Sequence, residues 1–516
     1  MITFATILFL SALLRITGIN WDQGFYFHPD ELALHYVSQR IHFFSNLDPN
    51  FFNYGTLPIY LLKGIAQILQ FEYDPYKVMI LGRVLSTLSD IGTLMVIFLI
   101  CRLLFQKKSI AYAASFFYAI AFFPIQNAHF FIVDTFLSFF LTLAIYRLLL
   151  YWKNPSLKSV IYIAIALAAA LSSKFTSIIF VPFICIALLI ISKHKIKDIL
   201  TFSFSLLVFH FLFMPYVFLD YKSFIKDVAL QLKLNSDPYF FPYTLQYVGT
   251  TPYLYYLKNI FLWGLGIPIA TLSVVGLVAM NLKCKVQSAK LQLKNQNYLI
   301  LVFAVFYLYY FLILGRSAVK FMRYMLPLYP FFVITAAYGF NKLKRSLKFV
   351  VIIIAVLWSA LFFSLYARPN TRISATNWIH TNIPQGSTIA VEHWDLRLPV
   401  TNSERYQIVE LPLYNLPDDK EKWKNIQESL RTVDYIIVAS NRLSTPLQKL
   451  TDCKKYKVCY PLTAKYYQQL FSKKPVATFT SYPQLIIDNW QLAIDDSSAD
   501  ESFTVYDHPT IYIFKL

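Results

Sequence analysis

Long apolar runs alternate with short polar loops along the first two thirds of the chain. About eleven of these runs come close to the 17–25 residues that a helix needs to cross roughly 30 Å of hydrocarbon. They lie at residues 2–20, 78–102, 110–127, 132–151, 158–173, 175–192, 199–218, 259–282, 299–314, 324–340 and 347–366. The pattern predicts a polytopic α-helical membrane protein. The boundary within 158–192 is the weakest, because only Lys174 and its neighbours separate the two halves.

Composition supports this prediction and removes an alternative. Of the 516 residues, 57% are hydrophobic and 15% are charged, whereas soluble domains carry about 25% charged residues. The net charge of +19 is compatible with a nucleic-acid-binding protein. However, the basic residues fall in small groups between apolar runs and form no stripe on a soluble domain, so we expect no nucleic-acid partner.

The basic groups also predict the orientation. They lie in alternate loops: Lys107–Lys108, Lys153 and Lys158, Lys193 to Lys197, the four lysines between 283 and 294, and Lys342 to Arg345. Such loops face the cytoplasm. The loops 21–77 and 219–258 and the tail 367–516 are then extracytoplasmic. The first run lacks a basic start and a cleavage site, so we expect a retained span, with Arg15 reaching the interface from its outer end.

The tail differs from the rest of the chain. Helix-like stretches at Lys420–Leu430 and Pro461–Phe471 alternate with strand-like runs at Thr388–His393, Asp434–Ala439 and Thr510–Phe514. The sequence therefore predicts two domains, 1–366 in the membrane and a smaller α/β domain at 367–516. Cys453 and Cys459 lie in that outer domain, where a disulfide is permitted; two ordinary thiols are the alternative.

The first outer loop contains the sequence FHPDELALHYVSQRIHFF. Leu34, Val37, Ile41 and Phe44 share one face of a helix that we expect to run from Asp30 to Phe44 along the membrane interface. Asp30 and Glu31 would lie at its start, where carboxylates stabilise the positive helix end. Capping alone would account for this pair if it were isolated.

Further ionisable residues lie at the same membrane level. Arg83 starts the second span, Asp134 the fourth and Arg323 the tenth, all on the outer side. Each alone is compatible with a structural ion pair, but several charges of both signs at one boundary favour a shared polar site. Within the spans, we expect structural roles for Asp90 and His210. The aromatic loop 238–256 suits interface anchoring, with sugar stacking as the sharper alternative.

These residues occur in an ordered series of segments that resembles the GT-C superfamily of polyprenyl-phosphate-sugar-dependent glycosyltransferases, especially the protein O-mannosyltransferase and aminoarabinose transferase branch. The series covers most of residues 1–366. Its members are FHPDELALHYV, NYGTLPIYLLKG, GRVLSTLSDIGTLMVIFLI, VDTFLSFFLTLAIY, SSKFTSIIFVPF, TPYLYYLKNIFLWGLGIP and KFMRYMLPLYPFFVITAAYGF. The tail segments NWIHTNIPQGSTIAVEHWD and YDHPTIYIF resemble the extracytoplasmic domains of bacterial members.

The resemblance implies inverting transfer of one sugar from a polyprenyl-phosphate carrier to an acceptor outside the membrane. Asp30 would be the general base, Glu31 its support through a pair with Arg83, and Asp134 would place acceptor or sugar. The donor phosphate and lipid would meet cations and one tyrosine: Arg83, Lys174, Arg323 and Tyr324. The candidate substrate-lining residues are His28, Tyr54 and Tyr247.

The sequence also departs from the resembled subfamilies. It has Leu32 and Ala33 where aminoarabinose transferases place a basic residue, and it lacks the luminal β-domain of eukaryotic protein mannosyltransferases. The acceptor, whether protein, glycan or lipid, therefore stays open. Some relatives use a divalent cation, for which His28, Asp30, Glu31 and Asp134 offer ligand atoms, but their spacing fixes no geometry and we expect no particular metal.

Two other classes of protein compete with this hypothesis. A lipid or glycan transporter would place charges near the midplane and show inverted repeats, neither of which the sequence has. A non-catalytic scaffold with an outer binding domain accounts for the tail but not for the charges at one membrane face. The exposed segments carry no Asn-x-Ser/Thr site, which favours a prokaryotic plasma membrane.

Overall fold

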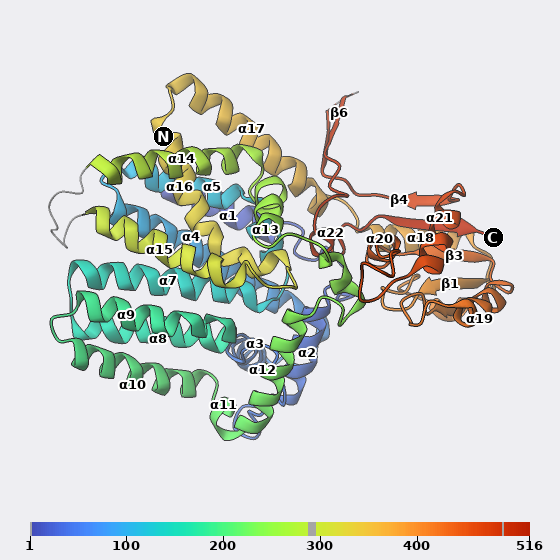
Figure 1. Ribbon diagram of the computed structural model, residues 1–516, viewed down its shortest axis with the longest axis horizontal. Helices are drawn as coiled ribbons and strands as arrows, with labels where there is room; N and C mark the ends of the chain where they lie inside the picture. The colour runs from blue at the N-terminus through green and yellow to red at the C-terminus, as the bar shows by residue number, and fades with distance from the viewer. Residues whose placement is uncertain (1–2, 287–295, 488–489) are drawn as a thin grey trace.

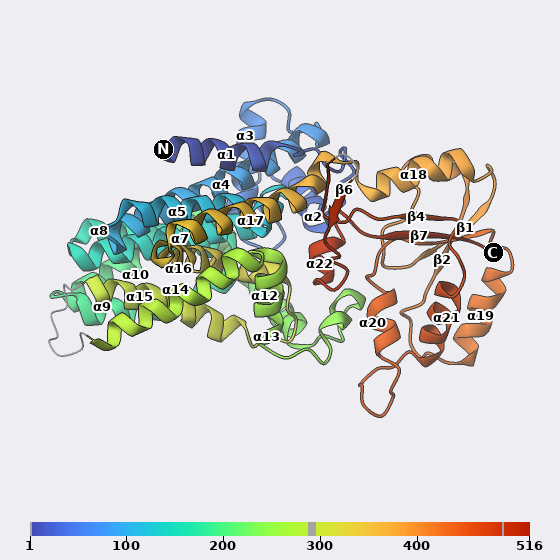
Figure 2. The same ribbon diagram turned by 90° about the horizontal axis from the view of Figure 1, so that it is seen from above.

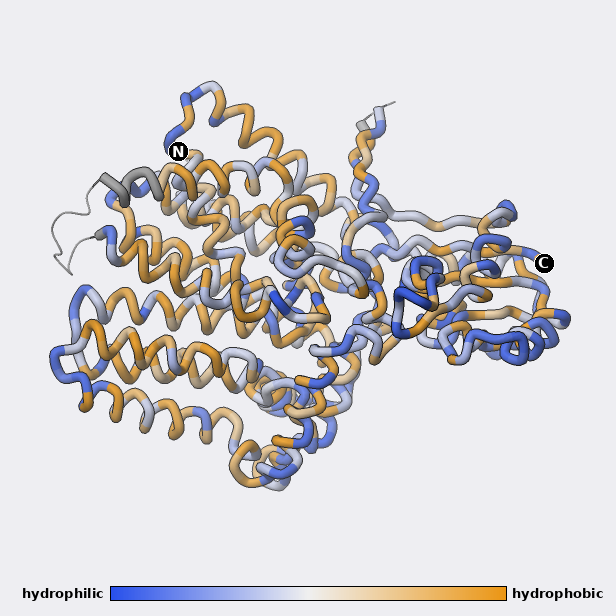
Figure 3. Tube along the Cα trace, in the orientation of Figure 1, coloured by the Kyte–Doolittle hydropathy of each residue, from blue (hydrophilic) through white to orange (hydrophobic). Residues whose placement is uncertain are grey.

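The computed structural model describes residues 3–286, 296–487 and 490–516. Its first part is a bundle of apolar helices that run side by side, and a mixed α/β domain adjoins one end of this bundle (Figure 1). Figure 3 shows hydrophobic residues along the bundle and more hydrophilic ones over the α/β domain. We call the bundle end next to this domain the site end.

A helix lies in each of the predicted spans. The bundle helices are α1 (Phe4–Ile16), α4 (Pro75–Leu104), α5 (Lys108–Ile120) with α6 (Phe122–Ala128), α7 (Val133–Lys153), α8 (Leu157–Ser173), η1 (Phe175–Ile179) with α9 (Phe180–Ile191), α10 (Lys195–Phe213), α14 (Ile267–Val286), α15 (Gln296–Leu314), α16 (Tyr329–Lys342) and α17 (Arg345–Phe363). Within the described residues, five helices are long and apolar enough to cross a membrane, or six if the bent pair α5–α6 is one span. The protein is therefore a multi-pass membrane protein, and the number of eleven spans stays a prediction. Most of the basic loop predicted between 283 and 294 lies outside the described residues.

Small residues allow close helix packing in this bundle. Gly276 of α14 and Gly339 of α16 face each other, and a Cβ at Gly276 would lie 1.8 Å from the Thr335 carbonyl oxygen. Packing of this kind is the main attraction between helices in lipid, where the hydrophobic effect between them is absent. Meanwhile α10 carries exposed apolar side chains such as Phe204 and Leu207, as a lipid-facing helix does.

Several buried polar residues of the bundle are paired with one another. Arg15 does not reach the interface, which corrects the prediction: it is fully buried, and its Nε lies 2.5 Å from Asp90 Oδ2. Its guanidinium also donates to the carbonyl of Ala119, so a buried partner satisfies it better than snorkelling would. The structural roles expected of Asp90 and His210 are consistent with their contacts, since Tyr118 donates to Asp90 and Ser172 bonds to His210.

Short helices cover the site end of the bundle. They are α2 (Pro29–Arg40), α3 (Leu57–Ile68), α11 (Tyr216–Leu219), α12 (Tyr221–Ser236), η2 (Pro242–Tyr247), α13 (Leu254–Asn259), η3 (Ile260–Gly264), η4 (Met322–Leu328) and η5 (Ser364–Ala367). Leu34, Val37 and Ile41 are buried as predicted. The prediction that the first helix continues to Phe44 is wrong: Ile41 is already extended, His42 pairs with Asn46 in a tight turn, and Phe44 is exposed with φ +73°.

The C-terminal domain is built on a five-stranded sheet in the order β2-β1-β3-β7-β4. Its strands are β1 (Thr388–Glu392), β2 (Gln407–Leu411), β3 (Tyr435–Val438), β4 (Ala477–Phe479) and β7 (Ile511–Lys515), of which β2, β1 and β3 are parallel. Helix α18 (Thr371–Asn382) covers one face, and α19 (Lys420–Leu430), α20 (Ser444–Lys449) and α21 (Pro461–Phe471) lie on the other (Figure 2). The α/β domain and the helices and strands expected in it are thus confirmed.

Two further features of this domain bear on the predictions. Cys453 and Cys459 form a disulfide with their Cα atoms 5.1 Å apart, the first of the two alternatives that the sequence left open. A hairpin of β5 (Gln484–Ile487) and β6 (Trp490–Ala493) leaves the sheet. After it, residues 496–510, which contain α22 (Glu501–Thr504), turn back to the helix bundle before β7 begins. We call residues 496–510 the return segment.

The return segment joins the two parts of the molecule. Phe503 and Tyr506 belong to the same apolar core as the bundle residue Phe122. Gln126 donates to the Phe503 carbonyl at 2.7 Å, and Tyr366 donates to Asp507 at 2.8 Å. Apolar packing and buried hydrogen bonds together fix the C-terminal domain on the site end of the bundle.

Candidate active site

Four charged side chains from distant parts of the chain meet at the site end. Arg323 Nη1 lies 2.6 Å from Asp30 Oδ2, and Arg323 Nε lies 4.0 Å from Asp134 Oδ2. Lys174 Nζ lies 2.7 Å from Asp134 Oδ1. We call these four residues the open cluster. Asp30, Asp134 and Arg323, which the sequence predicts at one membrane face together with Arg83, therefore lie close to one another.

Helix ends position all four residues. Pro29 occupies the first turn of α2, where its missing N–H costs nothing, and Asp30 follows it. Asp134 lies in the first turn of α7, and Arg323 in the short helix η4 that precedes α16. The first turns of α2 and α7 and the short helix η4 lie at the site end, so these three side chains lie there too.

Lys174 lies where α8 gives way to η1, which is the break that the sequence made doubtful. Gly55 of the first loop approaches this break closely: its N–H donates to the Ser173 carbonyl at 3.0 Å, and a Cβ would lie 2.0 Å from the Ser172 carbonyl oxygen. A glycine is therefore required to bring the first loop against the helix end that carries Lys174.

A mainly apolar cavity of about 390 Å³ borders the open cluster. Its lining includes Lys174 and Arg323, together with Tyr54 and Tyr324. Aliphatic side chains of η1, α12 and α15 supply much of its apolar surface: Ile178, Ile179, Val228, Leu232, Ile313 and Leu314. Neutral polar residues, among them Gln231 and Asn235, also line it. An apolar cavity bordered by two cations fits an amphiphile with an anionic head group.

Helix α12 forms one wall of this apolar cavity and is held there by polar contacts. Asp227 accepts a hydrogen bond from the Phe52 N–H at 3.0 Å. Asn235 accepts one from the Tyr324 hydroxyl at 3.0 Å, and its carbonyl accepts from the Val319 N–H. None of the α12 residues is buried. The helix thus separates the cavity from the outside of the bundle, and hydrogen bonds at Asp227 and Asn235 hold it in place.

Arg323 keeps unused hydrogen-bonding capacity. The close contact with Asp30 lacks hydrogen-bond geometry, and neither Nε nor Nη1 has a hydrogen-bond partner in the described part of the protein. The guanidinium carbon lies 5.1 Å from the centre of the Phe321 ring, which supports it from one side. A buried guanidinium with free donors is costly without a ligand, and phosphate oxygens are the acceptors that match its geometry.

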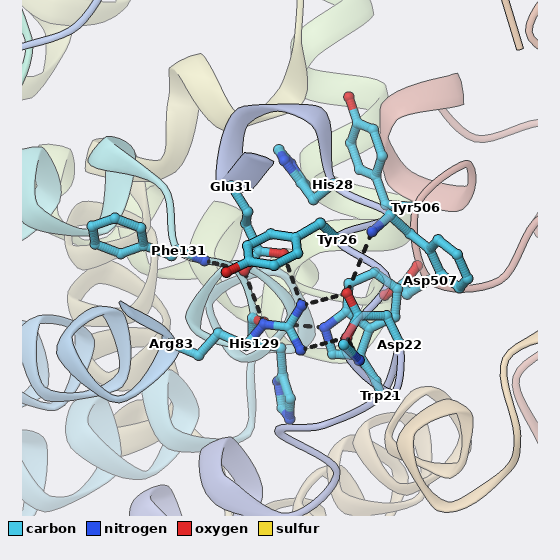
Figure 4. A network of polar contacts seen from close by, with 12 residues as sticks. Trp21, Asp22, Tyr26, His28, Glu31, Arg83, His129, Phe131, Tyr506 and Asp507 are labelled. Atoms are coloured by element: carbon cyan, nitrogen blue, oxygen red, sulfur yellow. Dashed lines mark hydrogen bonds and ion pairs between the residues drawn. The ribbon is translucent and has the colours of Figure 1, made fainter. Parts of the chain in front are cut away.

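A second group of charges lies nearby and has no such capacity (Figure 4). Arg83 is fully buried between Asp22 and Glu31, with N···O distances of 2.7 to 3.0 Å, and its Nη1 also donates to the Ile19 carbonyl. Glu31 accepts a further bond from the Phe131 N–H at 2.7 Å. We call Asp22, Glu31 and Arg83 the closed cluster.

The closed cluster changes the interpretation of two predicted residues. The expected pairing of Glu31 with Arg83 is present. However, Arg83 does not line the apolar cavity, and each of its nitrogens already has an acceptor, so the structure does not bring it to a donor phosphate. Asp22 was missed, because an acid right after the first span carries no signal beyond its position in WDQGF.

The remaining candidates divide according to their place. Tyr54 and Tyr324 line the apolar cavity, whereas Tyr247 does not and packs against Phe321 and Tyr255. His28 is buried and accepts a hydrogen bond from the Asp30 N–H at 3.2 Å, so it caps α2. Burial, and then the Arg323 charge, hold the pKa of His28 well below its usual range, which keeps the ring neutral for this role.

Tyr506 of the return segment was also missed. Its ring lies 4.1 Å from that of His28, and both residues border the same small space as Arg323. Figure 4 shows Tyr506 beside His28. The C-terminal domain therefore supplies part of the cover of the open cluster. Only contacts made in the folded protein could identify it, since residues about 475 positions apart share no local pattern.

Metal ligation was left open by the sequence. Among residues 3–286, 296–487 and 490–516, no group of three or more His, Cys, Asp or Glu side chains could hold a metal ion. In the open cluster Asp30 faces Arg323, and Asp134 faces Lys174. These carboxylates are thus paired with the protein's own cations.

Known proteins resemble this chain in one part of its sequence and in its fold. Residues 57–218 match the family model described as dolichyl-phosphate-mannose-protein mannosyltransferase. No curated protein matches the chain significantly. Among solved structures, the chain is similar to the Archaeoglobus fulgidus oligosaccharyltransferase complexed with Zn and sulfate, with a TM-score of 0.50, 12% identity and coverage of 90% of this chain and 70% of that one.

Another solved structure in the comparison is ArnT from Cupriavidus metallidurans bound to undecaprenyl phosphate. It has 11% identity and a TM-score of 0.48, and the match covers 80% of this chain and 92% of that one. At these identities the structural likeness concerns the fold alone.

Proposed function

We propose that this chain is a GT-C glycosyltransferase that moves a single sugar with inversion from a polyprenyl-phosphate carrier to an acceptor hydroxyl. The family match over residues 57–218 and the similar fold support this proposal. The observation that carries the proposal is the mainly apolar cavity of about 390 Å³ that Lys174 and Arg323 border, with Asp30 against Arg323. It supplies a place for a lipid, for its phosphate and for a base in one continuous arrangement.

The donor would bind with its prenyl chain along the apolar cavity. Burial of apolar surface contributes about 25 cal/mol per Å², and the aliphatic side chains of η1, α12 and α15 offer that surface. The phosphate would accept hydrogen bonds from the free donors of Arg323 and from Lys174, which lies 4.5 Å from the centre of the Tyr324 ring. Such charge-assisted bonds are about twice as strong as neutral ones.

In the transfer step, the acceptor oxygen forms a bond to the anomeric carbon as the bond from that carbon to the phosphate oxygen breaks. The acceptor proton passes to an Asp30 carboxylate oxygen, and the bonding electrons leave with the polyprenyl phosphate. Attack on the face opposite the leaving group inverts the anomeric carbon. A phosphate is a weak base and needs no general acid, so the cations stabilise the charge that develops on it.

Asp134 and the closed cluster would support this step without touching the reacting atoms. Asp134 holds Lys174 at 2.7 Å and lies 4.0 Å from Arg323, so it spaces the two cations. Glu31 is the next residue after Asp30 on α2, and its bonds to Arg83 anchor that helix turn. A fixed base and fixed cations contribute to rate because no reorganisation is needed when charge develops.

We place the open cluster on the extracytoplasmic face of a plasma or inner membrane, with the C-terminal domain on the same side. The basic loops lie at the other ends of the helices, where the cytoplasm is expected, and the Cys453–Cys459 disulfide suits an oxidising compartment. A transporter is disfavoured, since the open cluster lies at helix ends rather than in broken helices at the midplane.

The test compares Asp30→Asn with the wild type in nanodiscs that contain polyprenyl-phosphate sugars and a cell-envelope extract as acceptor. Release of polyprenyl phosphate is measured. Asp30→Asn should lower the rate about 10²- to 10⁴-fold, the range for a positioned general base, and should still copurify with the donor lipid in mass spectrometry. Asp48→Asn, in the same loop but partly exposed and outside the site, is the matched control.

Full transfer activity in folded Asp30→Asn would remove Asp30 from the base role. If neither the wild type nor Asp48→Asn carries or consumes any polyprenyl-phosphate sugar, the donor assignment fails. A non-catalytic scaffold predicts this second result, so the experiment separates the two classes of protein.

A further inference from the structure

A second, polar cavity of about 320 Å³ lies in the C-terminal domain, outside the proposed active site. It opens beyond the carboxyl end of the parallel strand β3, the edge at which open α/β sheets bind ligands. Its wall is formed by α20, the end of α21, the β4–β5 connection, the return segment and β7. Its volume is at the lower end of the range of about 300–1,000 Å³ for small-molecule sites.

Neutral hydroxyl and amide side chains dominate this wall. Nine of the fourteen lining residues are Ser, Thr, Asn or Gln: Ser440, Asn441, Ser444, Thr445, Gln448, Ser481, Ser497, Thr504 and Thr510. We call this space the hydroxyl-lined cavity. A hydroxyl is both a donor and an acceptor, so the lining matches a ligand whose own polar groups are hydroxyls.

Much of this hydrogen-bonding capacity is unused by the protein. In the described part of the chain, no side-chain hydrogen bond is formed by five of these residues: Asn441, Ser444, Thr445, Ser481 and Thr510. Water satisfies such groups in the free protein, and a polyhydroxylated ligand offers them the same bonds in one molecule.

Aromatic rings complete the lining. Phe471, Tyr482 and Tyr512 border the cavity, and the Phe471 ring is partly exposed and lies 5.4 Å from that of Tyr512. An exposed aromatic face beside a set of hydroxyls suits a ligand with both C–H and O–H surfaces. A purely apolar ligand would leave the hydroxyls without partners, which is unfavourable.

Charge disfavours an anionic ligand. The charged side chains of the lining are Asp496 and His508, which pair at 2.9 Å, and His508 also contacts Asp507 at 2.5 Å. The imidazolium is thus compensated by two carboxylates, and the lining offers no uncompensated cation to an anion. A phosphorylated or acidic ligand would meet no partner of opposite charge here.

We infer that the hydroxyl-lined cavity binds a neutral saccharide of one or two units. Thr504, His508 and Thr510 of the return segment border it, while Tyr506 of the same segment packs on His28 beside the open cluster. A free sugar and the end of an acceptor glycan offer the same chemistry. That the ligand is the end of an acceptor glycan rests on the proposed function, whereas saccharide binding itself does not.

The test measures binding of neutral mono- and disaccharides, such as methyl mannoside and mannobiose, to the full-length protein in nanodiscs by saturation-transfer NMR and titration. Glucuronic acid is the anionic comparison. Asn441→Leu and Thr510→Val each remove hydrogen bonds with little change in shape, and each should weaken binding about three- to tenfold. Thr478→Val, on the exposed side of β4 in the same sheet, is the matched control and should bind as the wild type does.

Absence of saccharide binding to the wild type, or equal binding by wild type, Asn441→Leu and Thr510→Val, overturns the inference. Asp30→Asn should bind saccharide normally, so failure of the transferase proposal and failure of this one are distinguishable. A raised KM for the acceptor with unchanged kcat in Asn441→Leu assigns the cavity to an acceptor glycan. Weakened binding with an unchanged KM assigns it to a free sugar.

Discussion

The open and closed clusters lie at the same end of the bundle and combine the same kinds of side chain, yet they differ in how far their hydrogen bonds are used. Arg83 donates from every nitrogen to Asp22, Glu31 and a carbonyl. Arg323 has one close carboxylate, no hydrogen bond from Nε or Nη1, and a cavity beside it. An arginine whose hydrogen-bond donors all have partners within the protein stabilises the fold. An arginine with free donors beside a cavity is suited to bind a ligand.

The largest difference between the clusters should appear in stability. Arg83→Met leaves Asp22 and Glu31 buried without a cation, which costs about 3–5 kcal/mol. We expect little folded protein, seen as a low yield of monodisperse material and a low apparent Tm. Arg323→Met is the matched variant and should fold, because Lys174 still pairs with Asp134 and the Asp30 side chain is partly exposed. Equal stability of the two variants would contradict the distinction.

The reverse order should appear in activity. Arg323→Gln should lower the rate of polyprenyl-phosphate release about 10²- to 10³-fold, the typical loss for one group that stabilises developing charge. Arg323→Lys should recover part of that rate, because the charge remains while the planar set of donors is lost. Retention of full activity by Arg323→Gln would place the phosphate elsewhere.

A third buried charge group extends the comparison to pH. Burial alone would lower the pKa of His508, but Asp507 and Asp496 raise it to about 10. The stability that this group contributes is therefore fully present below about 6.5, the ordinary histidine value, and is lost as the pH rises from there through about 10. Tm measured from pH 6 to 10 should fall more steeply in the wild type than in His508→Gln. Parallel curves would show that His508 is not charged in the folded state.

The smallest effect is expected where the C-terminal domain touches the open cluster. Tyr506→Ala removes a ring contact with His28 of about 0.5–1.5 kcal/mol, so transfer should fall only a few-fold while the protein stays folded. Tyr506→Phe keeps the ring and serves as the control with near wild-type activity. A Tyr506→Phe variant as impaired as Tyr506→Ala would show that the hydroxyl, and not the packing, matters.

The sequence predicted what depends on local pattern. Hydropathy located the helices, and the alternation in the tail located Lys420–Leu430, Pro461–Phe471 and three strands, because both follow from period and composition. The end of α2 was misplaced, since the turn at His42–Asn46 rests on a backbone pairing that periodicity does not encode. Pairings such as Arg15 with Asp90 depend on which helices become neighbours, and one chain's sequence does not show that.

The candidate site was predictable in the same partial way. Helix-end positions and a family resemblance brought Asp30, Asp134 and Arg323 together before the fold was known. They did not show that Arg83 lies away from the donor phosphate. An arginine at a span boundary has the same sequence pattern whether or not its hydrogen-bond donors already have partners. That distinction depends on Asp22 and on the Ile19 carbonyl, which only the folded loop brings to the guanidinium.

The return segment has a consequence for the order in which the protein is made. Residues 496–510 are synthesised after the described bundle helices and after most of the C-terminal sheet. Even so, Tyr506 and Asp507 pack on His28 of the first loop, Gln126 of α6 and Tyr366 of η5. A chain that stops before residue 496 would hold the helix bundle without the segment that covers the open cluster. Synthesis of the return segment is thereby a condition for the activity proposed above, set by the route of the chain.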